Sequence, residues 1–493
     1  MNSNDVFPKV KSLLESLNVC EKCTLRFLGD KHYESYSSEI SITKAFHQPS
    51  EEDVSNSSPP PKRLLPSVCA SCLGLLQDSC LKRITQIQEE IAASGHVFQD
   101  FVLQVSVPVV MDLRDMLFYL FLKETFGEEY SLSATDIPSA KDAWKWVTGP
   151  LLGKATGAAF NPGSNFRISV HISYLDTPLE CLPLLQKCPE AFPNRKKKKG
   201  RSEIIYTRTA VMKALTSLSS QVQTLFSLPP TSPSRGCSFE QVSCCHCPLY
   251  LGGRYNKYSR ELSQTPWVVD GERRMESSVS ELISDVVKRT IKCCDIVFSA
   301  SGREDVDVKM LGDGRPFVLE VINPRRVSWT SEEIKNVEKE INESTHLIAV
   351  KHLQIISKQD TLLLKEGEEM KRKSYTAVCL LDRTLSQEDI LKLEKVQDLV
   401  LMQKTPLRVL HRRTLSTREK LIHQLVGQIM EDDHLLRLRV VTQAGTYVKE
   451  FVHGDFGRTV PHLGDLLEAK TDILALDVES IHLDWPPPQE NKS

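Results

Sequence analysis

Hydrophobic and polar residues follow two different periods along the first half of the chain. Segments 101–107 and 166–172 alternate apolar and polar residues, a pattern that predicts strands with one buried face. Segments 84–93 and 113–126 repeat their apolar residues at helical spacing, which predicts two helices. We therefore expect residues 73 to about 235 to form an α/β or α+β domain.

A third alternating segment, in the second half, carries charges. Residues 306–310 read Val-Asp-Val-Lys-Met and follow an apolar run at 294–298, which predicts a strand. Asp305 would lie at the start of that strand, with Arg303 two residues earlier. Because ladder hydrogen bonds fix the direction of a strand end, Asp305 is a candidate nucleophile there. The alternative interpretation is a surface turn whose charges face water.

The chain of 493 residues is too long for one typical core and is expected to form two or three domains. The segment 228–236, L-P-P-T-S-P-S-R-G, has the composition of a linker. We therefore expect one domain at 1–235 and a second at 236–493.

Overall composition is ordinary for a soluble globular protein, with 40% hydrophobic and 26% charged residues and a net charge of −2. Charged residues interrupt the most apolar run, 107–122, and the first seventeen residues lack the apolar core of a secretory signal. No membrane association is therefore expected. Fourteen cysteines in such a chain favour a reducing compartment, and metal ligation before disulfides.

Two C-x-x-C pairs predict a structural metal site. Cys20 and Cys23 form one pair and Cys69 and Cys72 the other, and two such pairs are typical of one zinc ion held by four thiolates. Between them, residues 24–68 are expected to form a partly disordered insertion. A redox pair and buried free thiols are the alternatives. The remaining cysteines at 244–247 and 293–294 are interpreted as core or strand thiols.

Clusters of cations interleaved with aromatic residues predict contacts with RNA. Residues 252–260 contain three cations and two tyrosines, and the segment 403–420 holds six Lys or Arg against one Glu. Cations bind phosphates and aromatic faces stack on unstacked bases, as single-stranded or loop RNA requires. The candidate RNA-binding residues are Arg254, Lys257, Arg260, Arg273, Arg274, Lys404, Arg408, His411, Arg412 and Arg413.

The run 194–201 carries six positive charges in eight residues. A solvated loop is the default interpretation, and a nuclear import signal or an RNA phosphate contact is the alternative.

Two further segments could contribute to the site around Asp305. The strand-like run K-R-K-S-Y-T-A-V, which begins at Lys371, could bring the ring of Tyr375 beside it. A predicted strand, 436–441, turns through Gly445 into a helix that carries Lys449. A cation beside Asp305 would favour its ionised form in a dry pocket.

These segments, in this order, resemble the motifs of the pseudouridine synthases. S-V-x-E preceding S-G-R-E-D-V-D-V-K-x-L-G is similar to the first and second motifs, and G-T-Y-V-K to the third. R-Y-N-K-Y-S-R, Q-T-P-W, K-T-P-L-R-V-L-H-R-R and F-V-H-G-D-F-G-R-T resemble one member family, the eukaryotic and archaeal tRNA pseudouridine synthases of the T arm. The resemblance is close over residues 240–486 and looser before them.

The resemblance implies roles for particular residues. Asp305 would be the catalytic aspartate, Tyr375 would stack on the target base, and Lys449 would pair with the carboxylate. A forefinger loop at 265–278 and a thumb loop at 403–418 would grip the RNA. Where relatives in the wider superfamily have Leu or Thr, this chain has Glu304, so Glu304 and Asp307 are nominal rivals of Asp305.

The expected fold is α+β: a mixed, largely antiparallel pseudouridine synthase sheet with its cleft across it, plus an α/β THUMP-containing RNA-binding accessory domain with the four-cysteine zinc site. The expected activity is isomerisation of uridine at positions 54 and/or 55 of tRNA, without an organic cofactor. Asp305 would attack C1′ or C6, or remove the 2′ proton.

Two alternative functions follow from the same residues: an RNA-binding scaffold with a separate, non-catalytic role in RNA processing, and a zinc-dependent thiol oxidoreductase. We expect tRNA, and other structured RNA, as partners of a monomer in the nucleus and cytoplasm.

Overall fold

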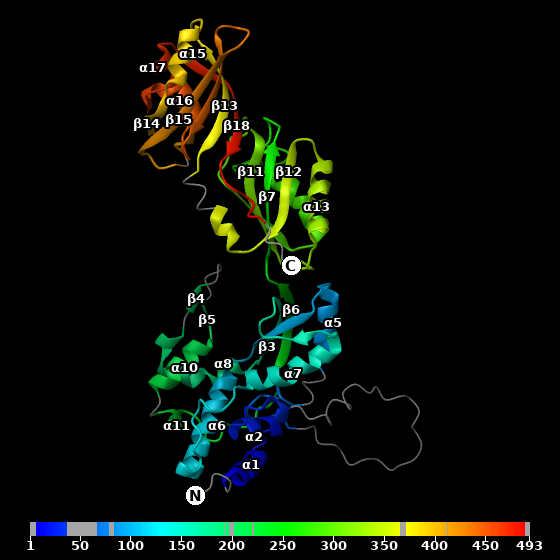
Figure 1. Ribbon diagram of the computed structural model, residues 1–493. Coiled ribbons are helices and arrows are strands. Elements are labelled where there is room, and N and C mark those ends of the chain that lie inside the picture. Colours follow the sequence, from blue (N-terminus) through cyan, green and yellow to red (C-terminus); the bar gives the residue numbers. More distant parts are fainter. Residues whose placement is uncertain are drawn as a thin grey trace. The chain divides into compact units, whose positions relative to one another are not determined.

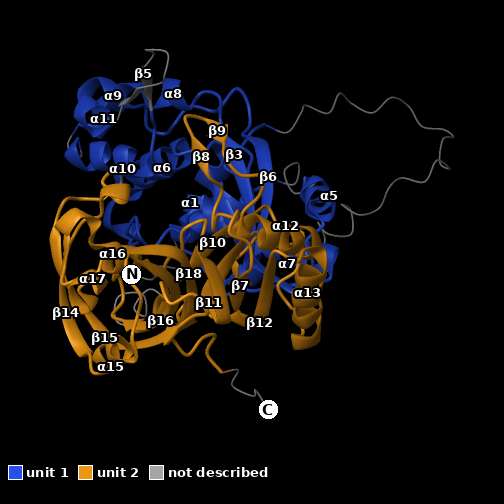
Figure 2. Ribbon diagram, turned by 90° about the horizontal axis from the view of Figure 1, so that it is seen from above, with its two compact units in different colours: residues 1–245 blue, residues 246–493 orange. Residues whose placement is uncertain are grey.

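The computed structural model divides the chain into two compact units, Met1–Cys245 and His246–Ser493, which Figure 2 colours separately. It describes residues 6–36, 67–77, 83–192, 194–196, 202–218, 221–364, 371–411 and 413–488. Most of the predicted insertion 24–68, the lysines at 197–199 and Arg412 lie outside the described residues. Among those described, no helix has the length and apolar character needed to cross a membrane.

The first unit is built on a four-stranded sheet in the order β2-β1-β3-β6, with β1 parallel to both β2 and β3 (Figure 1). The strands are β1 (Asp100–Ser106), β2 (Ala159–Phe160), β3 (Phe166–Ser173) and β6 (Ser238–His246). Alternate residues of β1 and β3 are buried, as their sequence pattern predicts. The two predicted strands of this half are thereby confirmed.

Helices account for most of the rest of the first unit. They include α1 (Val6–Ser16), α2 (Glu21–Phe27), α5 (Ile84–Ser94), α6 (Val110–Phe126), α7 (Ala140–Thr156) and α10 (Arg208–Ser217). The helices predicted at 84–93 and 113–126 correspond to α5 and α6 and are confirmed. The first residues of the predicted insertion are ordered: α2 and a 3-10 turn, Tyr33–Tyr36, occupy part of it, and Phe27 and Tyr36 belong to the core.

The predicted boundary at residue 235 also differs from the division between the units. Residues 238–246 form β6, which hydrogen-bonds to β3 of the first unit. The Pro- and Ser-rich segment at 228–236 is therefore a connection within that unit. Composition revealed the loop, whereas strand pairing determines the unit to which the following segment belongs.

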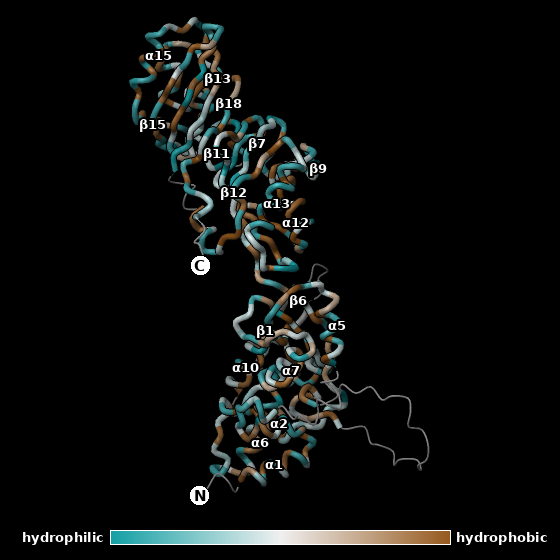
Figure 3. The backbone as a smooth tube through the Cα atoms, turned by 45° about the vertical axis from the view of Figure 1, so that its right-hand side comes forward, coloured by the Kyte–Doolittle hydropathy of each residue, from teal (hydrophilic) through white to brown (hydrophobic). Residues whose placement is uncertain are grey.

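The second unit is organised around a ten-stranded sheet in the order β12-β7-β11-β18-β13-β16-β15-β14-β17, with β10 also paired to β11 (Figure 1). The strands are β7 (Leu249–Lys257), β10 (Asp295–Ala300), β11 (Lys309–Ile322), β12 (Ile348–Ile356), β13 (Lys373–Leu381), β14 (Gln397–Lys404), β15 (Thr417–Ile429), β16 (Leu435–Thr442), β17 (Thr459–Val460) and β18 (Thr471–Ile481). Figure 3 colours each residue by hydropathy; β15 carries both polar and hydrophobic residues, and its buried residues are Ile422, Leu425 and Gly427.

The helices that accompany this sheet include α12 (Val279–Ile291), α13 (Ser331–Ser344), α15 (Gln387–Glu394), α16 (Val448–His453) and α17 (Leu463–Leu467). Ser278 caps the start of α12, because its hydroxyl accepts a hydrogen bond from the Glu281 N–H. A small hairpin, β8 (Val268–Val269) and β9 (Glu272–Arg273), lies within the segment predicted as the forefinger loop.

Only β11 and β18 pair in parallel among the strand pairings described for this sheet, and their pairing covers two positions, Lys309↔Asp477 and Met310↔Val478. The neighbouring pairs on both sides are antiparallel. The prediction of a mixed, largely antiparallel sheet is therefore confirmed. Because β11 and β18 pair at only two positions, the hydrogen-bonded sheet is narrow at this point.

The strand predicted from residue 306 begins at Lys309 instead. Residues 305–308 form a turn, in which the N–H of Val308 donates to the carbonyl of Asp305 at 3.1 Å. Two of the cysteines interpreted as core or strand thiols are neither, because Cys247 and Cys294 are exposed and lie outside the strands. Cys293 precedes β10 and packs against the core.

Candidate active site

A cavity of about 600 Å³ opens where the sheet changes from β11 to β18. Its walls come from the turn between β10 and β11, from β13 and β18, from the thumb loop (residues 403–418) and from the start of α16. Asp305, Arg303, Tyr375 and Lys449 all line it, so the four predicted catalytic residues meet at one place. This volume is within the usual range for small-ligand sites.

The inner side of the Asp305 turn is anchored by Glu304. Its side chain is fully buried and accepts hydrogen bonds from Arg315 Nε at 2.6 Å and from the Tyr255 hydroxyl at 2.8 Å. Arg315 also donates to the carbonyl of Ser301 at 2.7 Å. Burying either charge without its partner would be very costly, so the Glu304–Arg315 ion pair has a structural role. Glu304 is therefore not available as a nucleophile.

Lys257 holds the same turn from a second direction. Its ammonium group is fully buried and donates to the carbonyls of Leu262 at 2.8 Å, Asp305 at 3.1 Å and Val306 at 2.7 Å. Burial lowers the pKa of Lys257 to about 8. Glu304 and Lys257 thus fix the turn, and the side chain of Asp305 lines the cavity.

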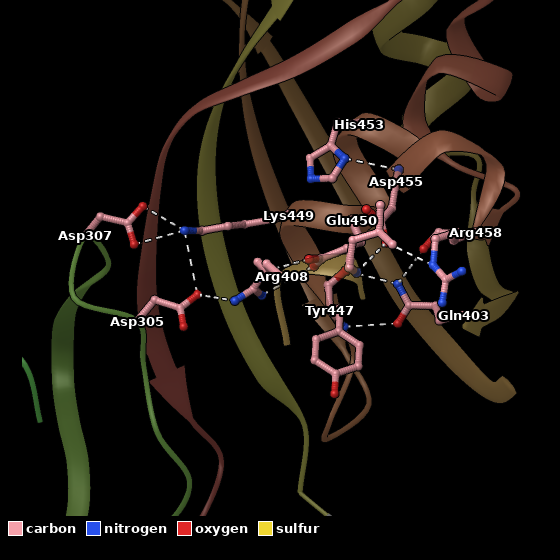
Figure 4. Close-up of polar contacts among 12 residues, drawn as sticks. Asp305, Asp307, Gln403, Arg408, Tyr447, Lys449, Glu450, His453, Asp455 and Arg458 are labelled. Atoms are coloured by element: carbon pink, nitrogen blue, oxygen red, sulfur yellow. Dashed lines mark hydrogen bonds and ion pairs between the residues drawn. The ribbon is translucent and has the colours of Figure 1, made fainter. Parts of the chain in front are cut away.

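Two cations approach the carboxylate of Asp305 (Figure 4). Arg408 Nη1 lies 2.7 Å from Asp305 Oδ2, and Lys449 Nζ lies 3.6 Å from the same oxygen. About a third of the Asp305 side chain, 32%, stays exposed. The carboxylate is thus surrounded by positive charge on one side and open to the cavity on the other.

The nearest partner of Lys449 is Asp307 rather than Asp305. Lys449 Nζ lies 2.9 and 2.7 Å from the two carboxylate oxygens of Asp307 (Figure 4). Although burial by itself would raise it, hydrogen bonding to Lys449 holds the pKa of Asp307 below its usual range. The lysine is therefore shared between two carboxylates of one turn, whereas the sequence predicted a pair.

Arg408 was predicted to bind RNA phosphate, but its guanidinium lies between two protein carboxylates. Besides Asp305, it contacts the buried Glu450, with Nε 2.6 Å from Oε1. Although its burial opposes this, Glu450 raises the pKa of Arg408. Sequence reasoning missed both Glu450 and Arg315. For Arg315 the available signal was a cation directly before the apolar run of β11.

Tyr375 lies on β13 and lines the cavity. Burial raises the pKa of Tyr375 to about 12, so the phenol stays neutral near neutral pH. A neutral aromatic ring in the wall of a polar cavity is suited to pack against a planar base.

The remaining RNA-binding predictions divide by burial. The structure does not support an RNA contact by Arg254, because the residue is 6% exposed and its guanidinium donates to backbone carbonyls, including those of Asp313 and Leu483. Lys257 is wrong for the same reason. Arg260 donates to Asp307 O and pairs with Asp477 at 2.7 Å, so it also holds the turn that carries Asp305. The exposed members of the set are Arg273, Arg274, Lys404, His411 and Arg413.

The turn that follows α16 has an unusual backbone. Residues 454–457, Gly-Asp-Phe-Gly, all have positive φ, with values of 73°, 47°, 55° and 77°. For a residue with a Cβ, left-handed backbone costs roughly 1–2 kcal/mol, and it usually occurs singly. Asp455 and Phe456 are therefore strained.

Contacts with the base of the thumb loop hold this turn. Leu407 N–H donates to the carboxylate of Asp455 at 3.2 Å, and Arg458 donates to the carbonyl of Thr405 at 2.6 Å. Asp455 N–H donates to His453 Nδ1 at 3.1 Å. The side chain of Phe456, in contrast, is 94% exposed and contributes little to the packing of the protein.

The four cysteines of the first unit come together as predicted. Their sulfur atoms lie within 4.8 Å of one another, and Cys20 Sγ is 3.8 Å from Cys72 Sγ. A tetrahedron with metal–sulfur bonds of about 2.3 Å has edges of about 3.8 Å, so the cluster fits a metal ion. The Arg26 guanidinium donates to Cys23 Sγ at 3.3 Å, and the N–H of Leu76 to Cys72 Sγ at 3.3 Å. Such donors favour thiolates.

Comparison with known proteins places these observations in one family. Residues 250–482 match the family described as "Pus10, C-terminal", and residues 69–244 match "Eukaryotic Pus10, N-terminal". The chain is 44% identical over 424 residues to the human "tRNA pseudouridine synthase Pus10", covering 85% of this chain and 79% of that protein. It is 38% identical over 513 residues to the Xenopus laevis protein of the same name, covering 98% of both chains.

A solved structure, "Crystal Structure of a Cbf5-Nop10-Gar1 Complex", is 16% identical and covers 46% of this chain and 48% of that one, with a TM-score of 0.27. A likeness this low carries no argument about function.

Proposed function

Because the chain belongs to the Pus10 family of pseudouridine synthases, we propose that it isomerises uridine to pseudouridine in the T arm of tRNA, at positions 54 and/or 55. The relatives at 44% and 38% identity are named for tRNA, and the motifs in residues 252–455 resemble the T-arm enzymes. The observation that supports a catalytic role for Asp305 best is its partly exposed carboxylate, which lines the cavity beside Arg408, Lys449 and Tyr375.

The reaction breaks the N1–C1′ bond of uridine, turns the uracil and joins C5 to C1′, while C5 loses a proton and N1 gains one. Atoms and electrons balance within the nucleotide, with no external oxidant or group donor. The enzyme has to supply an ionised carboxylate, a surface for the detached ring and exclusion of water. Asp305 supplies the first and Tyr375 the second.

The target uridine has to leave its stack to enter the cavity, which costs a few kcal/mol. Stacking on Tyr375 would return about 1–3 kcal/mol. Arg408 Nη1 lies 2.7 Å from Asp305 Oδ2, so a nucleotide that reaches the carboxylate would take over part of that contact. The exposed cations of the thumb loop, Lys404 and Arg413, would hold phosphates.

We propose that the ion of the four-cysteine cluster is one zinc, with Cys20, Cys23, Cys69 and Cys72 as its ligands. Four protein sulfurs leave no open coordination position, so a bound zinc would stabilise the fold and take no part in the reaction. We propose that the first unit is a THUMP-containing RNA-binding accessory domain, as the motif resemblance implies.

The test of the catalytic proposal is Asp305→Asn, which keeps the size of the side chain and removes its charge. We expect no pseudouridine at positions 54 and 55 when tRNA transcripts are mapped, with tRNA affinity within about threefold of the wild type. Unchanged turnover would overturn the assignment of Asp305. Absence of pseudouridine with the wild-type protein itself would overturn the proposed substrate.

A further inference from the structure

The ring of Phe456 is exposed, and packing within the protein does not account for its position. An aromatic side chain normally contributes its large apolar area to a core, but Phe456 is 94% exposed. Its backbone is also left-handed, with φ of 55°, a conformation that favours glycine. The backbone strain at Phe456 is therefore not offset by burial of its ring. Such strain is typical of residues that bind a ligand or a partner molecule.

The position of the turn indicates what that use is. The Asp455 carboxylate and Arg458 fasten it to Leu407 and Thr405 of the thumb loop. The same loop contributes Arg408 and Arg413 to the wall of the cavity. The turn that carries the ring is therefore attached to a loop that forms part of the cavity wall.

The distance along the chain sets the reach. Lys449, in the cavity wall, and Gly454 are five residues apart in and just after α16, or about 8 Å of helix axis. Successive stacked bases are about 3.4 Å apart, so a base two or three positions from the target lies within that span. The thumb loop, to which this turn is fastened, also carries the exposed cations Lys404 and Arg413. An aromatic face beside cations is the pattern that binds unstacked bases.

We propose that Phe456 is a nucleobase-stacking site for a base of the substrate RNA two or three positions from the uridine in the cavity. This inference rests on the proposed function, and it adds a contact outside the cavity. The left-handed turn presents the ring to the RNA, and the thumb contacts keep it from collapsing onto the protein.

The first test uses the full chain with Phe456→Gly. Glycine suits a φ of 55°, so the melting temperature is expected to stay the same or rise. Loss of one base–aromatic stack is expected to raise the Kd for tRNA transcript about 5- to 150-fold. Because stability and affinity move in different directions, misfolding could not produce this result. Wild-type affinity for tRNA would overturn the proposal.

The second test separates stacking from a general apolar contact, such as one with a partner protein. Phe456→Trp is expected to keep wild-type affinity and Phe456→Leu to lose it, because leucine keeps the apolar area but has no flat face. The dependence of log Kd on log salt is expected to keep its slope, since no phosphate contact is removed. Wild-type tRNA affinity in Phe456→Leu would overturn the proposal.

The matched control is Leu391→Ala. Leu391 is an apolar residue with 54% exposure on α15, a helix that contributes nothing to the cavity wall. Its tRNA affinity is expected to equal that of the wild type, and an equal loss there would also overturn the proposal. Failure of the proposed function would appear differently, as absence of pseudouridine formation by the wild-type protein.

Discussion

Arg26 in the first unit and Arg408 in the second both lie against acidic groups, but their surroundings differ. Arg26 is fully buried and uses its donors on Asp115, Ser71, Cys23 and the carbonyl of Pro138. The Arg408 side chain is 37% exposed, and one of its partners, Asp305, is 32% exposed.

The difference separates a cluster that specifies structure from one that can react. Around Arg26 the donors have protein partners, so a new ligand would have to break existing contacts that solvent does not reach. Around Asp305, the backbone is fixed by Lys257 and Glu304 while the carboxylate itself faces a cavity. A reactive group needs this combination of rigid support and an open face.

The largest expected effect on stability is that of removing a metal ion from the four-cysteine cluster beside Arg26. Structural zinc contributes about 10–16 kcal/mol in zinc-finger peptides, so a chelator or Cys69→Ser is expected to unfold much of the first unit. Hydrogen exchange of the full chain should show loss of protection confined to residues 6–245. Cys245→Ser, which alters an exposed cysteine outside the cluster, should leave protection unchanged. Full protection in the chelated protein would contradict a structural metal.

The support beneath the open cluster can be tested with Lys257→Met. The substitution leaves the carbonyls of Leu262, Asp305 and Val306 without their donor, so kcat is expected to fall about 10- to 100-fold. The Kd for tRNA should change little, because Lys257 is buried. Lys351→Met is the control, since Lys351 is only half-buried and donates to the carbonyl of Gly312 outside the Asp305 turn. A loss of tRNA affinity with unchanged kcat would restore the RNA-binding interpretation of Lys257.

The charge of Lys257 also gives a pH dependence. Its pKa falls from the ordinary 10.5 to about 8 in the folded protein, so the unfolded chain binds more protons between these two values. The free energy of unfolding should therefore rise over that range for the wild type relative to Lys257→Met. Below about pH 8 both states are protonated and the difference should be flat. Denaturant titrations from pH 7 to 10.5 would measure it, and a falling difference would contradict the assigned shift.

Spacing and motifs in the sequence predicted several residues of both clusters. The C-x-x-C spacing identified all four cysteines, and the motif order led to Asp305, Tyr375 and Lys449, which the fold brings to one cavity. These cases share a local signal, because each residue lies in a short pattern that its chemistry requires.

The residues that sequence reasoning misplaced lack such a local signal. Arg254 and Lys257 stand among tyrosines just as phosphate-binding cations do, but β7 is an interior strand and takes them into the protein. Arg315 and Glu450 acquire their roles from partners 11 and 42 residues away in the chain. Tertiary pairing, which no window of sequence contains, decided both cases.

The smallest expected effect concerns the acid that shares Lys449 with Asp305. The Asp307 side chain is 65% exposed, and exposed ion pairs contribute about 0–1 kcal/mol. Asp307→Asn is therefore expected to lower kcat by no more than about fivefold, since the amide still accepts a hydrogen bond from Lys449. Single-turnover kinetics beside Asp305→Asn would measure the ratio. Because both acids belong to one turn and contact the same lysine, a loss as complete as that of Asp305→Asn would make Asp307 an equal member of the reacting pair. An effect within fivefold would show that position over the cavity, and not proximity to the lysine, distinguishes the catalytic carboxylate from its neighbour.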